Sequence, residues 1–309
     1  MKDIRIENYR YTLYLLVTVF GWGIMYPASK HAVSSGLDGY YLTFIRYVLG
    51  AFLVSFVLLI IEGKKSYKTE GNTFQLWFFG TIGFAGLNFL TFIGIGFSSA
   101  EHATIILALM PMLSMILSSI LNHNIPHIKT ILFTVLAFVG IILVITNGDF
   151  NNLIASSSFL GDLLLLAATT CWVIYTYFAN MMITKHKWSA LRVTALSSSL
   201  GVLSIIAITL IASLLELASP PSLDVLITSG FDIFVLVITT LVIITWNAGI
   251  NGVGAINGIL FVNLVPVISF IIGIYQGHSI SYIEFIGAII TIIALVLNNI
   301  YMRTIKSSK

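Results

Sequence analysis

Long runs of apolar residues, separated by short polar gaps, follow one another along almost the whole chain. A helix needs roughly 20 apolar residues to cross the ~30 Å hydrocarbon core of a bilayer, and it satisfies its own backbone hydrogen bonds there. The pattern therefore predicts an all-α, polytopic membrane protein with ten transmembrane helices. We expect these helices at Tyr11–Val33, Tyr40–Ile61, Phe74–Phe97, Glu101–Leu121, Lys129–Asn147, Leu160–Ile183, Leu191–Leu215, Phe231–Asn251, Ala255–Gln276 and Glu284–Tyr301.

The composition agrees with this pattern and excludes several classes of protein. Hydrophobic residues make up 58% of the chain, charged residues make up 9%, and the mean hydropathy is +1.01, far from a soluble domain. The gaps are too short for a nucleotide-binding domain, and no Walker loop, Gly-x-Ser-x-Gly or His-Glu-x-x-His motif occurs. Because these motifs are absent, we expect no enzyme activity; we also expect no cofactor and no nucleic-acid partner. Cys171 is the single cysteine, so we expect no disulfide and no metal site built on cysteines.

Basic residues are distributed unevenly between the polar gaps. Thirteen of the fifteen lysines and arginines lie in alternate gaps or near the chain ends, whereas Lys30 and Arg46 lie at the rim of a span and inside one. Basic residues are enriched in cytoplasmic loops, so both termini are predicted to be cytoplasmic. The thirteen residues are Lys2, Arg5, Arg10, Lys64, Lys65, Lys68, Lys129, Lys185, Lys187, Arg192, Arg303, Lys306 and Lys309.

The sequence also contains an internal repeat. Residues 94–111 align with residues 249–266 without a gap. The first half, residues 11–147, and the second half, residues 160–301, then hold five predicted spans each. Because five is odd, the second half must cross the membrane in the opposite sense. Such inverted repeats are the usual basis of alternating access, with the substrate held near the midplane between the halves. Identical aligned residues are Gly94 and Gly249, Ala100 and Ala255, Pro111 and Pro266, and, at a similar offset, Trp22 and Trp172.

Four motifs resemble a known family. They are Gly21-Trp22-Gly23 in the first span, Arg46 in the second, the run from Ser98 to Pro111, and its counterpart ending at Pro266. Over nearly the whole chain, the sequence resembles the drug/metabolite transporter superfamily and, within it, the ten-helix EamA-type members. The chain departs from the pattern at Asn122-His123 and Gly277-His278, where many halves of that family carry a Gly-Glu pair.

The resemblance implies a secondary transporter that moves a small metabolite by alternating access. The expected substrate is an amino acid, an amine or a related compound. The expected location is the plasma or inner cell membrane. By analogy with the family, the expected direction of transport is efflux. Uptake of a quaternary amine or a nucleotide-sugar-like metabolite stays open, as does a channel. A monomer and a homodimer are equally compatible with the sequence.

Aromatic and amide side chains in the middle of the spans are the candidate cavity residues. Trp22 and Trp172 are related by the repeat, and Tyr26 and Tyr175 lie about one helical turn further along. Around a midplane cavity, they would form an aromatic box for a flat side chain or a quaternary amine. Packing between helices explains them equally well. The full set is Trp22, Tyr26, Asn88, Trp172, Tyr175, Trp246 and Asn247.

Arg46, Glu101 and His102 are the candidate gating and coupling residues. A charge as deep as Arg46 usually faces a cavity or a partner, and Glu101 is the nearest plausible counter-ion by depth. Glu101 and His102 are also candidates for proton coupling, because both groups can change charge. The alternatives are that Arg46 is a structural residue that binds backbone carbonyls or a carboxylate near the end of its helix, and that Glu101 complements a helix dipole.

Pro111 and Pro266 occupy equivalent positions in the two repeats. Each proline removes a backbone hydrogen bond within or near a span. We expect them to act as hinges and kinks in their helices rather than as substrate contacts.

Overall fold

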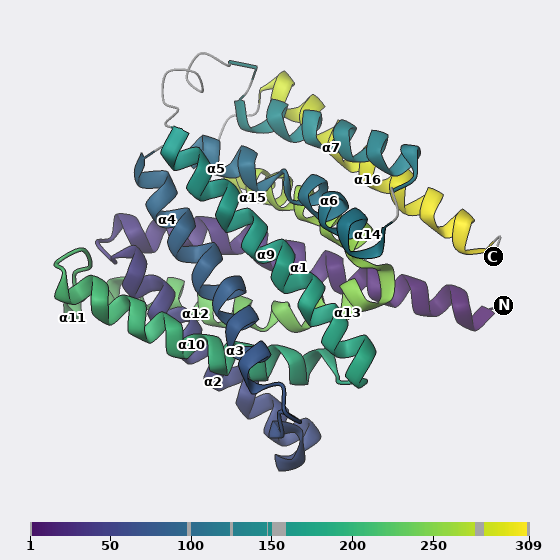
Figure 1. Cartoon of the computed structure of the whole chain (residues 1–309). Coiled ribbons are helices and arrows are strands. Elements are labelled where there is room, and N and C mark those ends of the chain that lie inside the picture. Colours follow the sequence, from purple (N-terminus) through teal and green to yellow (C-terminus); the bar gives the residue numbers. More distant parts are fainter. Residues whose placement is uncertain are drawn as a thin grey trace.

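In the computed structural model, the regular elements of the described residues are helices, which confirms the all-α class (Figure 1). The described residues are 2–97, 100–123, 126–146, 148–149, 159–275 and 281–307. The α-helices are α1 (Lys2–Ser34), α2 (Gly39–Glu62), α3 (Thr73–Gly80), α4 (Leu87–Phe97), α5 (Ala100–Leu107), α6 (Met110–Asn122), α7 (Ile128–Thr146), α9 (Phe159–His186), α10 (Ala190–Leu214), α11 (Leu223–Thr228), α12 (Gly230–Thr240), α13 (Val242–Val253), α14 (Ala255–Ile259), α15 (Leu264–Tyr275) and α16 (Tyr282–Ser307).

Seven helical segments within the described ranges are long and apolar enough to cross a membrane. They are Tyr9–Ser34, Gly39–Glu62, Thr73–Phe97, Ile128–Thr146, Phe159–His186, Ala190–Leu214 and Gly230–Val253. Three shorter apolar helical segments fall within or across the other predicted spans, at Ile105–Leu121, Ala255–Ile268 and Tyr282–Asn298. The hydrophobic pattern thus located the long helices closely.

Many large apolar side chains are exposed on the outside of the molecule, while some hydroxyl groups are buried inside it. Phe52, Phe159 and Phe231 are 72%, 84% and 76% exposed, whereas Thr169 and Ser197 are fully buried. A soluble monomer rarely exposes so much apolar surface. This exposed apolar surface indicates that lipid covers the long helices.

Two of the predicted spans are interrupted close to a proline. The predicted span Glu101–Leu121 is divided into α5 and α6, and Pro111 lies in the first turn of α6. A 3₁₀ segment, Leu260–Asn263, separates α14 from α15, and Pro266 lies in the first turn of α15. Proline has no N–H to donate to the carbonyl four residues earlier, so the regular helix is weakened at these places. Whether the interruptions act as hinges stays a prediction.

Glycines allow helices α3 and α10 to approach closely. A Cβ atom at Gly80 would lie 2.2 Å from the carbonyl oxygen of Ser197, and a Cβ atom at Gly201 would lie 2.8 Å from the carbonyl oxygen of Gly80. A π-helical turn, Thr81–Gly86, follows α3 and leads into α4. Small residues of this kind let helix backbones pack in lipid, where the hydrophobic effect does not drive helices together.

Helices α7 and α16 pack side by side as a pair (Figure 1). A Cβ atom at Gly140 would lie 2.7 Å from the Gly287 carbonyl oxygen, and a Cβ atom at Gly287 would lie 2.6 Å from the Gly140 carbonyl oxygen. Since α7 belongs to the first predicted half and α16 to the second, this pair joins the two halves.

The start of α1 and the end of α16 lie on the same side of the molecule, and the short helix α11 lies on the opposite side (Figure 1). This arrangement fits a chain that enters and leaves the membrane on one side. That this side is cytoplasmic stays a prediction from the charge pattern.

The contact between α3 and α10 can be tested by adding one methyl group. We expect Gly80→Ala to lower the free energy of unfolding by about 1–3 kcal/mol, because the methyl group would overlap a backbone oxygen that cannot move freely. Gly96→Ala, whose Cβ atom would meet no atom within 4 Å, is the matched control. The measurement is thermal unfolding of both purified variants in one detergent. Equal melting temperatures would show that the close approach is not needed.

Candidate functional site

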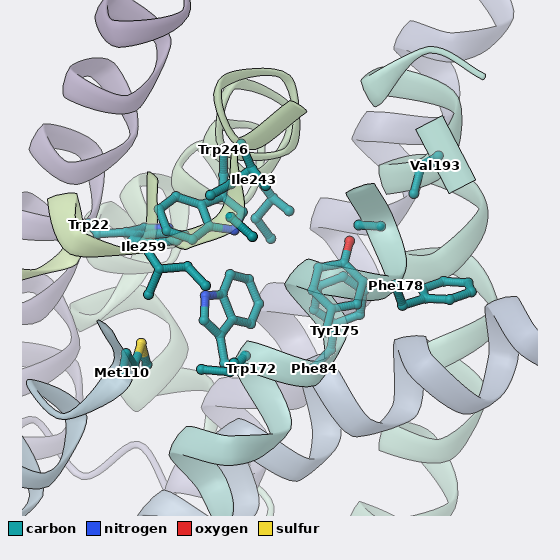
Figure 2. Packing of buried hydrophobic residues seen from close by; sticks show 14 of the residues in the cluster. Trp22, Phe84, Met110, Trp172, Tyr175, Phe178, Val193, Ile243, Trp246 and Ile259 are labelled. Atoms are coloured by element: carbon teal, nitrogen blue, oxygen red, sulfur yellow. The ribbon is translucent and has the colours of Figure 1, made fainter. Parts of the chain in front are cut away.

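Three tryptophans from both predicted halves meet in the middle of the molecule. The ring of Trp22 of α1 lies 5.5 Å from that of Trp172 of α9 and 5.0 Å from that of Trp246 of α13, and the last two rings lie 6.3 Å apart, measured between ring centroids; Figure 2 shows the three rings together. Tyr175 adds its ring 5.3 Å from Trp172, and Phe84 lies 4.8 Å from Tyr175. We call these five residues the central aromatic cluster.

Hydrogen bonds between helices hold the polar atoms around this cluster. The indole N–H of Trp246 donates to Thr176 Oγ1 at 3.1 Å. The Nδ2 atom of Asn247 donates to the Tyr175 hydroxyl at 3.2 Å and to Thr194 Oγ1 at 2.9 Å. Its Oδ1 atom is enclosed and accepts no hydrogen bond from a described residue. The Oδ1 atom of Asn247 is therefore available to accept a hydrogen bond from a ligand that enters the core.

The candidate cavity residues Trp22, Trp172, Tyr175 and Trp246 are therefore brought together, but they pack on one another. None of the four is more than 9% exposed. In this conformation they form a packed core between the halves, and a ligand would have to separate the rings to enter a box. The side chain of Tyr26 lies outside the described part of the protein, so its role in the box stays a prediction.

Arg46 and Asn88 flank a second tyrosine at the edge of this core. The Arg46 guanidinium carbon lies 4.9 Å from the centre of the Tyr47 ring. Asn88 Nδ2 donates to the Tyr47 hydroxyl at 3.2 Å and to the Phe84 carbonyl oxygen at 2.8 Å. The Tyr47 ring in turn lies 5.3 Å from Phe84, a member of the central aromatic cluster. Arg46 is thus connected to the cluster through Tyr47, and Asn88 is connected to it both through Tyr47 and directly at Phe84.

Two residues of the predicted coupling group cannot be compared with this geometry. Glu101 and His102 belong to α5, but their side chains lie outside the described part of the protein. The expected ion pair between Glu101 and Arg46 therefore stays a prediction.

Sequence reasoning missed a contact between an imidazole and a carboxylate. His31 Nδ1, near the end of α1, lies 2.6 Å from Asp232 Oδ2 in the first turn of α12. The Asp232 side chain is only 10% exposed, whereas that of His31 is 65% exposed. The only signal in the sequence was an acidic residue at the start of a predicted span, which also fits a helix dipole.

A second group of polar residues lies beyond the other end of α2. Arg192 Nη2 donates to Glu70 Oε1 at 2.6 Å and to the Lys68 carbonyl oxygen at 2.5 Å. Trp188 Nε1 donates to Glu70 Oε2 at 3.1 Å, and the Arg192 guanidinium lies 4.0 Å from the centre of the Trp188 ring. Ser189, which caps α10, donates to Glu62 Oε1. The two predicted halves are connected here as well.

These two contacts lie at opposite ends of α2. His31 precedes the first residue of α2 and Glu70 follows its last residue. Each contact joins a residue of the first predicted half to a residue of the second. We call them the His31–Asp232 contact and the Glu70–Arg192 contact. Among the described residues, no group of three His, Cys, Asp or Glu side chains is placed to hold a metal ion.

The Glu70–Arg192 contact predicts a specific dependence of stability on pH. The hydrogen bond from Arg192, and then that from Trp188, hold the pKa of Glu70 below its usual value of 4.5. Ionised Glu70 therefore stabilises the folded protein above about pH 4.5, and this contribution is lost as the pH falls through the lower folded-state pKa.

We expect the melting temperature of the wild type to exceed that of Glu70→Gln by a small amount near neutral pH, because the carboxylate is exposed. The difference should disappear in acid, below the folded-state pKa. Thermal unfolding of both proteins in one detergent across this range checks it. A difference that stays constant into acid would show that the charge of Glu70 does not stabilise the fold.

Comparison of the sequence with those of known proteins assigns the chain to a family. The model of the EamA-like transporter family matches residues 10–146 and again residues 159–300. The chain is 34% identical over 295 residues to the uncharacterized transporter YrdR of Bacillus subtilis (strain 168), covering 93% of this chain and 90% of that protein. It is 28% identical over 250 residues to the uncharacterized transporter YyaM of the same organism, covering 81% of each.

A crystal structure with 15% sequence identity superposes with a TM-score of 0.76, covering 95% of this chain and 98% of that one, and so supports the fold. The resemblance that the sequence motifs indicated is confirmed. The chain belongs to the EamA-like transporter family and is a multi-pass membrane transporter.

Proposed function

We propose that this transporter is a secondary carrier that moves a small metabolite, an amino acid, an amine or a related compound, out of the cell by alternating access. The observation that carries the proposal is the arrangement of contacts between the two predicted halves. A packed aromatic cluster joins them at the centre, and a separate polar contact joins them at each end of α2. A carrier needs closures of this kind on both sides of a central site.

The proposed topology has ten spans in two inverted halves, residues 11–147 and 160–301, in the cell membrane with cytoplasmic termini. Seven long and three shorter apolar helical segments in the described chain support the number of spans. The two matches of one family model, to residues 10–146 and 159–300, support two related halves. The positive residues around Lys64 and Lys185 support a cytoplasmic location for the Glu70–Arg192 contact.

The chemistry of the two end contacts suits reversible opening. The Glu70 side chain is 49% exposed and that of His31 is 65% exposed, so water can replace either partner when the contact separates. Exposed ion pairs contribute little net stability, which keeps opening inexpensive in free energy. The central cluster is buried instead, and its separation would create space for a solute only between the halves.

A carrier of this kind is identified by counterflow. Purified protein is first screened for thermal stabilisation by amino acids and amines, since a ligand that prefers the folded state raises the melting temperature. Labelled ligand should then accumulate in proteoliposomes preloaded with the same unlabelled ligand, with a rate that saturates. Flux that neither saturates nor responds to preloading would indicate a channel instead.

Alternating access also predicts that the two ends open in turn. In a Cys171→Ser background, Ala32→Cys reports on the end with the His31–Asp232 contact, and Ser66→Cys reports on the end with the Glu70–Arg192 contact. Both reporter positions are buried, at 0% and 8% exposure. We expect His31→Ala to increase maleimide labelling at position 32 and to decrease it at position 66.

Glu70→Ala should have the opposite effect on the same two reporters, because loosening one end favours closure of the other. Lys30→Ala and Lys65→Ala, which remove exposed charges near each end, are the matched controls and should change neither. If either contact variant raised labelling at both ends, the contacts would stabilise the fold locally without coupling the two sides.

A further inference from the structure

Arg46 is a buried cation without a counter-ion among the described residues. It is only 9% exposed, although it lies in the first third of α2, inside the apolar part of the chain. Its guanidinium group lies over the ring of the neighbouring Tyr47 and makes no ion pair or hydrogen bond with a described residue. Arginine stays protonated in proteins, so the positive charge is present whatever the surroundings.

A charge in this position needs a partner. Removing a cation from water is costly unless an anion and hydrogen-bond acceptors replace the lost solvent. The ring face of Tyr47 attracts a cation but supplies neither a negative charge nor an acceptor for the N–H groups. If Arg46 had the structural role and bound backbone carbonyls or a carboxylate of the protein, hydrogen bonds from its nitrogens to those oxygens would be present. No described residue accepts one.

Arg46 has hydrogen-bond donors to spare. Its Nε atom is enclosed and makes no hydrogen bond to a described residue, and a guanidinium group has further N–H donors on its two Nη atoms. Asn88, which donates to the Tyr47 hydroxyl, is partly exposed and uses only Nδ2 in hydrogen bonds to the described residues. Its Oδ1 atom is free to accept. One cation and one amide acceptor therefore border the same tyrosine, next to the central aromatic cluster.

We propose that Arg46 binds the carboxylate of the transported metabolite, and that Asn88 accepts a hydrogen bond from a donor on the same molecule. This inference deepens the proposed function by assigning the substrate class, and it rests on that function. A guanidinium fork matches a carboxylate in a bidentate geometry. A phosphate ester carries about 1.5 to 2 negative charges at neutral pH, and the site provides a single cation among the described residues, so a carboxylate monoanion is the better match.

The test compares molecules that differ only in this charge. Acetate and acetamide, benzoate and benzamide, and alanine and alaninamide are titrated against the purified wild type, with the melting temperature as readout. In the pair whose body fits the site, we expect the carboxylate to bind at least about ten-fold more tightly than its amide. Inorganic phosphate is titrated alongside them.

Variants of Arg46 test whether its guanidinium group distinguishes the carboxylate of a ligand from the corresponding amide. Arg46→Gln should abolish the preference for the carboxylate, and Arg46→Lys should keep a weaker preference, because lysine supplies the charge without the fork. Lys30→Gln removes an exposed cation from the preceding helix and should leave the preference unchanged. If Arg46→Gln does not yield folded protein, the wild type and Arg46→Lys still decide between the outcomes.

Three results would overturn the inference. They are equal affinity of the wild type for every carboxylate and its amide, stronger stabilisation by phosphate than by every carboxylate, and a preference that survives in Arg46→Gln. If Glu101 neutralises Arg46 within the protein, the wild type will show no preference and Glu101→Gln will gain one, which also contradicts the proposal.

The proposed function can fail separately from this inference. Saturable counterflow of a solute without preference for the carboxylate would contradict the role of Arg46 and leave the carrier function standing. Carboxylate-selective stabilisation that depends on Arg46, without counterflow of any stabilising ligand, would support the site and contradict the carrier function.

Discussion

The hydrocarbon interior of the membrane cannot donate or accept hydrogen bonds. Polar groups of the protein at that depth must therefore find their partners within the protein. Backbone groups are satisfied within helices, and buried hydroxyls such as that of Thr169 donate to a carbonyl one turn earlier. Trp246 and Asn247 have partners on other helices. Since burial from water does not drive helices together in lipid, close packing at glycines and these hydrogen bonds hold the core.

Two kinds of interface between the halves follow from the same constraint. At the centre, the halves meet through aromatic rings around Trp22, which packs edge to face on Trp172 and in a tilted arrangement on Trp246. At the ends of α2, they meet through polar groups, in the His31–Asp232 and Glu70–Arg192 contacts, each of which has one exposed partner. Water can replace a charged partner but not a packed ring, so the ends are suited to separation and the centre defines the shape available to a solute.

Arg46 differs from the other buried polar residues named above, because its charged group has neither a counter-ion nor a hydrogen-bond acceptor among the described residues. Its guanidinium group lies over the ring of Tyr47, which attracts a cation but carries no negative charge. A permanent cation that is buried without an anion contributes to function more readily than to stability, because leaving it unpaired destabilises the fold. This cost is the reason to look for its partner outside the protein.

The sequence alone determined the positions of the long helices, because crossing lipid requires long apolar helices. Residues 40–61 were predicted as a span, and α2 extends from Gly39 to Glu62. A helix that is apolar on all sides does not reveal which face meets which neighbour. Only the tertiary structure therefore decided that Trp22 packs on Trp172. It also decided the His31–Asp232 and Glu70–Arg192 contacts, whose partners are separated in the sequence by 201 and 122 positions, respectively.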